Sequence, residues 1–139
     1  MIVLDTSGLL AWIDANQRLH GAVAEAMKDV SPPYLLSPFV LAELDYLVAT
    51  RVGRKEEHAL LEEIEGGAYD VVTFTNEDVG RALSVVMRFE DLEVGLADAS
   101  IVVIAERYRT HDVLTLDERH FRTLTGSDGR PFRLLPADA

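Results

Sequence analysis

The chain has 139 residues, which is the size of one domain, and we expect residues 1–139 to fold as a single unit. Apolar residues make up 48% of the chain and cysteine is absent, so we expect a packed core and exclude disulfides, cysteine nucleophiles and thiolate metal sites. The net charge of −11 opposes binding to the phosphates of nucleic acids unless a local feature reverses the sign.

The first apolar run, Ile2–Leu4, does not alternate with polar residues, which is typical of a parallel strand covered on both faces. It ends at Asp5, and neither a basic leader nor an apolar stretch of about 18 residues accompanies it. We therefore expect a cytoplasmic protein that does not contact a membrane.

The rest of the chain alternates helices and strands. The expected helices are Leu9–Ile13, Gly21–Val30, Pro38 to about Val52, 54–65, Asn76 to about Phe89, and about Val94 to Arg109. The expected later strands are Tyr34–Leu36, Tyr69–Phe74, Val113–Leu116 and Phe132–Leu135. Because strands separated by helices pair in parallel through right-handed crossovers, we predict an α/β fold. Its expected form is a three-layer α/β/α sandwich with a central, mostly parallel sheet of four to five strands.

Two of these helices have recognisable starts. Ser37 followed by Pro38 fits an N-cap and a first helical residue, and residues 75–78 resemble a capping box. Gly53 ends the first of the two central helices, so residues 38–65 are expected to form a helical hairpin.

Asp5 and Asp117 each follow a predicted strand, at the sheet edge where ligands bind in open α/β folds. Each also has a structural interpretation, because Asp5 can cap the next helix and Asp117 can begin a turn. Their positions alone leave both interpretations open.

Glu43 and Asp98 interrupt the apolar faces of their helices. Glu43 lies one turn from both Val40 and Leu47, where leucine would be expected. Asp98 stands among apolar residues in the same way, although its place near a helix start also gives a favourable interaction with the helix dipole. Carboxylates on buried faces need basic partners or cations.

Basic partners for these acids are scarce. The only lysines, Lys28 and Lys55, lie in segments expected at the periphery, and no arginine is expected on the helix faces beside Glu43 or Asp98. A divalent cation is the simpler partner, and oxygen ligands favour Mg²⁺, with Mn²⁺ as a substitute, over Zn²⁺. The four histidines, at positions 20, 58, 111 and 120, lack a metal-binding spacing and are expected on the surface.

Four segments, in this order and at these spacings, resemble the acidic motifs of PIN-domain ribonucleases, especially the VapC toxins of bacterial toxin–antitoxin pairs. They are Leu4–Ser7, Ala42–Leu44, Leu96–Ala99 and Thr115–Phe121. The resemblance spans essentially the whole chain and departs from the family pattern at Glu118, where such toxins often carry a basic residue. It implies a PIN-like fold and a Mg²⁺-dependent endoribonuclease that is the toxin of a type II toxin–antitoxin system.

The resemblance implies that Asp5, Glu43, Asp98 and Asp117 are the catalytic and metal-binding residues, with Asp5 and Asp98 as the primary ligands. Metal held by these carboxylates would orient the attacking water and stabilise the leaving oxygen of the cleaved RNA.

Four more residues are candidates for supporting roles. The hydroxyls of Thr6 and Thr115 are candidates for orienting two of these acids, with ordinary turn and strand propensity as the alternative. Arg119 and Arg122 are candidates for contacting the RNA backbone, with solvated surface arginines as the alternative.

The implied partners are an RNA substrate, a small cognate antitoxin with a basic and apolar tail, and a second copy that forms a homodimer. The hairpin of residues 38–65 is the expected contact face for the tail or for the second copy. Two other functions stay open: a non-catalytic PIN-like module that binds metal or a basic peptide, and an RNA-processing PIN nuclease without an antitoxin. The presence of all four acids favours a nuclease over the non-catalytic module.

Overall fold

A five-stranded parallel sheet lies at the centre of the computed structural model, which describes residues 1–139. The strands are β1 (Ile2–Leu4), β2 (Tyr34–Leu36), β3 (Asp70–Val71), β4 (Asp112–Leu114) and β5 (Arg133–Leu135). Their order across the sheet is β3-β2-β1-β4-β5, and all neighbours are parallel. The chain builds outward from β1 through β2 to β3, then returns to the other side of β1 with β4. The strand order therefore reverses between β1 and β4, which is where open α/β sheets bind ligands.

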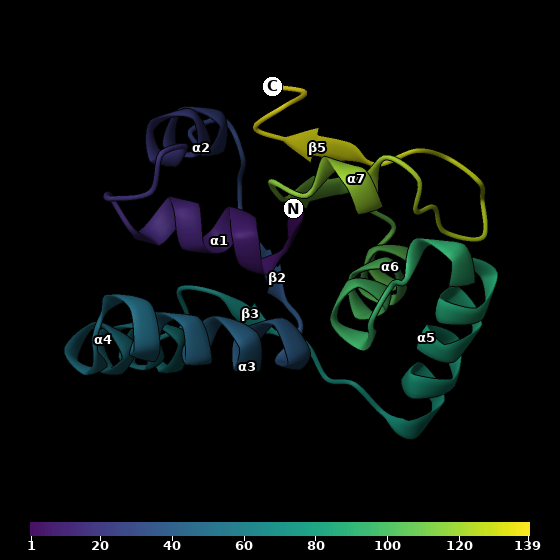
Figure 1. Ribbon diagram of the computed structural model, residues 1–139, viewed down its shortest axis with the longest axis horizontal. Helices are drawn as coiled ribbons and strands as arrows, with labels where there is room; N and C mark the ends of the chain where they lie inside the picture. The colour runs from purple at the N-terminus through teal and green to yellow at the C-terminus, as the bar shows by residue number, and fades with distance from the viewer.

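Helices flank this sheet, and the expected three-layer α/β/α sandwich is confirmed (Figure 1). The α-helices are α1 (Thr6–Ile13), α2 (His20–Met27), α3 (Pro38–Leu47), α4 (Arg54–Glu65), α5 (Asn76–Arg88), α6 (Leu96–Tyr108) and α7 (Glu118–Phe121). Two short turns complete the set, the π-helical η1 (Val48–Val52) and the 3-10 helical η2 (Glu90–Leu92). Figure 1 shows α4 and α5 at opposite ends of the long axis. No helix is both long and apolar enough to cross a membrane.

The apolar core explains why the first strand does not alternate. All three residues of β1 are fully buried, because β2 and β4 lie on its two sides and α6 packs against it. Helix α6 is itself buried from Ala99 to Ala105, since it contacts β1 and also packs along α5. The helix that carries Asp98 is thus fixed directly to the central strand.

Both predicted helix caps are present. The Ser37 hydroxyl accepts a hydrogen bond from the Phe39 amide, with Pro38 in the first turn of α3. Thr75 and Asp78 form a reciprocal capping box at the start of α5. These caps rest on local hydrogen bonds, which is why the sequence could specify them.

Helix α1 begins at Thr6 rather than at the predicted Leu9. The first turn contains Ser7 and Gly8, which are weak helix formers and favour a loop in a sequence pattern. Gly8 is needed because α1 lies against β4, where an added Cβ would stand 2.5 Å from the carbonyl oxygen of Leu114. This close approach brings the residues after β1 and β4 together.

Other elements also differ from expectation, and β3 spans only Asp70–Val71 instead of Tyr69–Phe74. The long helix that begins at Pro38 ends as an α-helix at Leu47 and continues as the π-helical turn η1 to Val52. Helix α7 was not expected, because four residues are too few to show a helical period.

Candidate active site at the edge of the sheet

The four predicted acids, which come from four separate elements, line one cavity of about 520 Å³. Asp5 follows β1, Asp117 follows β4 and precedes α7, Asp98 lies in the first turn of α6, and Glu43 lies in α3. The cavity opens at the carboxyl edge of β1 and β4, where the strand order reverses. Residues far apart in sequence are therefore gathered by the sheet topology.

Asp5 is the most buried of the four acids, with 7% of its surface exposed. Its side chain makes no capping hydrogen bond to α1, which argues against the capping interpretation. Its Oδ2 instead accepts hydrogen bonds from Thr115 Oγ1 at 2.6 Å and Ser7 Oγ at 3.1 Å. Burial raises the pKa of Asp5 to about 6, with a further contribution from the charge of Asp98 that the hydrogen bond from Thr115 opposes.

The hydroxyls around Asp5 also bind the backbone after β4. Thr115 Oγ1 accepts from the Asp117 amide at 2.9 Å, and Ser7 Oγ accepts from the Leu116 amide at 2.9 Å. The Thr115 hydroxyl thus contacts the carboxylate of Asp5 but only the backbone of Asp117, and its orienting role stays a prediction. Thr6 makes no such contact: its buried hydroxyl has no hydrogen-bond partner. Ser7, two residues after Asp5, supplies the second hydroxyl, and the sequence interpretation missed it.

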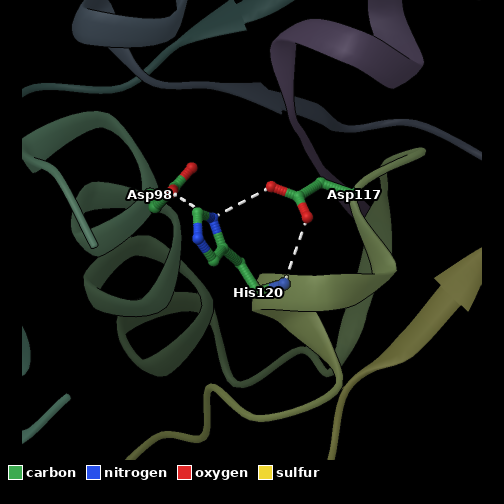
Figure 2. A group of neighbouring side chains, drawn as sticks. All are labelled: Asp98, Asp117 and His120. Atoms are coloured by element: carbon green, nitrogen blue, oxygen red, sulfur yellow. Dashed lines mark hydrogen bonds and ion pairs between the residues drawn. The ribbon is translucent and has the colours of Figure 1, made fainter. Parts of the chain in front are cut away.

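Asp98 and Asp117 face each other across the ring of His120 (Figure 2). The Nδ1 atom of His120 lies 3.1 Å from Asp98 Oδ2 and 3.0 Å from Asp117 Oδ2. Burial raises the pKa of Asp98, and repulsion from Asp117 and Glu43 adds to this effect while His120 opposes it. The other carboxylate oxygen of Asp117 accepts from the His120 amide at 3.1 Å, so Asp117 also caps α7.

The expectation that all four histidines are solvated surface residues is confirmed only for His58, because His20, His111 and His120 are half-buried. Of these, His120 belongs to the site. Its side chain is 21% exposed and lines the cavity. A helical turn would have indicated this position, since His120 lies three residues after Asp117 and shares its side of the helix. The sequence did not indicate this position because α7, with four residues, is too short to show a helical period.

The expectation that Glu43 interrupts a buried helix face is also wrong. The buried residues of α3 and the following turn are Val40, Leu44 and Val48, whereas Glu43 is exposed beside this stripe. Glu43 therefore needs no buried partner, and it borders the cavity from the solvent side.

The arginines are arranged differently from the predictions. Arg119 and Arg122 do not line the cavity, and Arg122 is bound by two carboxylates, Glu118 at 2.8 Å and Asp138 at 2.7 Å. Arg51 does line the cavity, although no arginine was expected near Glu43. The prediction erred because η1 changes which residues follow Glu43 along the helix face.

The donor set fits a divalent cation. Asp98, Asp117 and His120 each offer one ligand atom, and these atoms lie within 4.8 Å of one another. Asp5 and Glu43 add carboxylates to the same cavity, no lysine lines it, and the pKa values of Asp5 and Asp98 are both raised. Carboxylates that share one cavity gain stability from a hard cation such as Mg²⁺, and the imidazole nitrogen is compatible with Mn²⁺.

Comparisons with known proteins identify the family and several similar proteins. The family profile of the PIN domain matches residues 2–126. Ribonuclease VapC26 of Mycobacterium tuberculosis is 44% identical over 135 residues, which cover 97% of this chain and 100% of the relative. The crystal structure of M. tuberculosis VapC20, described as a sarcin-ricin loop cleaving toxin, matches with a TM-score of 0.77 and 21% identity over 84% of this chain and 90% of that chain. FitAcB from Neisseria gonorrhoeae matches with a TM-score of 0.54 and 20% identity over 78% of this chain and 83% of that chain.

Proposed function

The chain belongs to the PIN domain family, and from this premise we propose that it is a Mg²⁺-dependent endoribonuclease. The observation that carries the proposal is the gathering of four carboxylates from separate elements in one cavity without a lysine. A relative that matches the chain over nearly its full length is named a ribonuclease, which supports RNA as the substrate.

We assign Asp5 and Asp98 as the primary metal ligands, with Asp117 and Glu43 completing the site directly or through water. Bound Mg²⁺ or Mn²⁺ would supply a nucleophilic hydroxide and would neutralise charge on the phosphate. Thr115 and Ser7 orient the carboxylate of Asp5 through the hydrogen bonds to its Oδ2.

Two further residues of the site, His120 and Glu43, affect its charge and the proton of the attacking water. His120 Nδ1 lies between Asp98 Oδ2 and Asp117 Oδ2, at 3.1 and 3.0 Å, so the imidazole separates the two carboxylates. Glu43 is the exposed acid at the cavity, so one of its carboxylate oxygens can accept a proton from the attacking water and release it to solvent.

The test is RNA cleavage by the purified protein. We expect cleavage with Mg²⁺ or Mn²⁺, none after chelation with EDTA, and none for Asp98→Asn, whereas Asp91→Asn removes an exposed acid in η2 and should leave cleavage unchanged. Because a water-derived nucleophile does not use the 2′-hydroxyl, the products should carry 5′-phosphate and 3′-hydroxyl ends. Cleavage that persists in EDTA, or that yields 2′,3′-cyclic phosphates, would contradict the proposal.

We further propose that the protein is the toxin of a type II toxin–antitoxin pair. The net charge of −11 is complementary to a basic tail, and an apolar groove of about 350 Å³ between α1 and α4 is available for apolar residues of that tail. The groove is rimmed by Asp14, Glu56 and Glu63. The hairpin of residues 38–65 borders it and remains our candidate face for a homodimer.

A further inference from the structure

The cavity that contains the four acids is also lined by Arg51. Leu10, Gln17 and Leu47 are among its other lining residues, and no other arginine or lysine lines it. The cavity therefore combines acidic residues suited to metal with one arginine.

The π-helical turn brings Arg51 to this face. Glu43, Leu47 and Arg51 follow one another at intervals of four residues, and all three line the cavity. In a continuous α-helix, a residue eight positions after Glu43 would be rotated by about 80° from it. The π turn, closed by a hydrogen bond of 2.8 Å from the Gly53 amide to the Val48 carbonyl, turns less per residue and reduces this rotation.

The charge of Arg51 is not neutralised within the chain. Arg51 is exposed and forms no ion pair, whereas Arg54, Arg107 and Arg122 are each bound to carboxylates. If Arg51 served as a counterion for the four acids, an ion pair with one of them would be expected. Its guanidinium is therefore available to an anion that enters from outside.

We propose that Arg51 binds a backbone phosphate of the RNA, one that neighbours the phosphate being cut. This inference rests on the proposed nuclease function. In α-helical geometry, eight residues displace Arg51 by about 12 Å along the axis from Glu43, so Arg51 lies about two turns from the acid that borders the metal site. Guanidinium groups suit this role because they stay charged and bind phosphate in a bidentate manner. Arg51 thus supplies the local positive charge that an acidic protein needs to hold RNA.

The experiment measures RNA binding separately from cleavage. The affinity for a fluorescein-labelled poly(U) oligonucleotide, shown by gel to remain intact, is measured by fluorescence anisotropy at several salt concentrations. The variants are Arg51→Ala, Arg51→Lys and, as a matched control, Arg130→Ala. Arg130 is also exposed, but it lines a different cavity together with His111. Because His111 directly precedes β4, that cavity lies at the opposite edge of the sheet from the acids.

We expect Arg51→Ala to weaken binding about tenfold at low salt and to reduce the slope of log K against log salt by about 0.7, the value for one lost phosphate contact on a single strand. Arg51→Lys should keep the slope, and Arg130→Ala should behave as the unchanged protein. Mg²⁺ affinity of Arg51→Ala, measured by calorimetry, should be equal or higher, because a cation near the acids has been removed.

An unchanged salt slope in Arg51→Ala, or equal losses in Arg51→Ala and Arg130→Ala, would overturn the proposal. Neither result would affect the nuclease assignment, which depends on Mg²⁺-dependent cleavage by the unchanged protein. Absence of that cleavage would instead contradict the proposed function, while the binding series would still report on Arg51.

Discussion

Thr115 joins the two strand ends of the site through a single hydroxyl. Its proton is donated to Asp5 Oδ2 at 2.6 Å, and its oxygen accepts from the Asp117 amide at 2.9 Å. The residue is 1% exposed, so water cannot take its place in either bond. The carboxylate of Asp5 is therefore oriented from β4, although Asp5 itself follows β1.

We predict that Thr115→Val weakens Mg²⁺ affinity by about 10- to 100-fold, because valine keeps the shape and removes the hydrogen bond that orients a metal ligand. Thr115→Ser should restore most of the affinity. Thr123→Val, a matched change at an exposed position, should have no effect. Calorimetric titration with Mg²⁺ measures all three, and equal affinity for Thr115→Val and the unchanged protein would show that the hydroxyl does not position Asp5.

The sequence predicted the acids of the site better than the residues that contact them in the fold. Asp5 and Asp117 follow buried strands, and that position indicated them without knowledge of the fold. Ser7 and His120 were missed because a serine in a turn and a histidine in a polar segment have many ordinary explanations. Their contacts depend on which strands become neighbours, and local sequence carries little information about that.

Two buried serines connect the helices that carry Glu43 and Asp98. Ser37 caps α3 and Ser100 lies in α6, and their hydroxyls are 2.7 Å apart. Ser100 Oγ donates to the Ala97 carbonyl at 2.6 Å, so Ser37 must donate to Ser100. A directed chain of hydrogen bonds thus runs from the start of α3 to the residue before Asp98.

We predict that Ser37→Ala and Ser100→Ala each lower the free energy of unfolding by about 1–3 kcal/mol, because each leaves a buried hydroxyl without one partner. The double variant should lose less than the sum, with a coupling of about 0.5–3 kcal/mol. Ser84→Ala, at an exposed site on α5, should change stability by less than about 0.5 kcal/mol. Urea unfolding provides the measurement, and additive losses would mean that the two hydroxyls act independently.

Elements could be predicted where a local pattern was long enough. The strands β1 and β2 and the helix α4 match their predicted bounds, since each combines a buried or amphipathic pattern with clear breakers. The π turn η1 and the helix α7 were not predictable in this way. Tertiary packing decides whether a helix widens by one residue or whether four residues close a turn.

The whole molecule combines a net charge of −11 with a cavity in which carboxylates repel one another. Cations therefore affect the protein in two ways, by general screening of its surface and by specific binding at the site. Screening depends on ionic strength and does not saturate at a stoichiometric concentration. Specific binding to the native state saturates and depends on the ligands, so thermal stability can distinguish the two.

We predict that Mg²⁺ stabilises the protein by about 2.7 kcal/mol at 100 times its dissociation constant, which corresponds to a rise in melting temperature of about 10 °C. NaCl at matched ionic strength should give a smaller shift without saturation. Asp98→Asn should lose the saturable part while its stability without metal is equal or higher, because the substitution removes a repelled charge from the cavity. Asp91→Asn should keep the full response. Differential scanning calorimetry over a Mg²⁺ series provides the test, and identical responses to Mg²⁺ and matched NaCl would show that the four acids do not form a metal site.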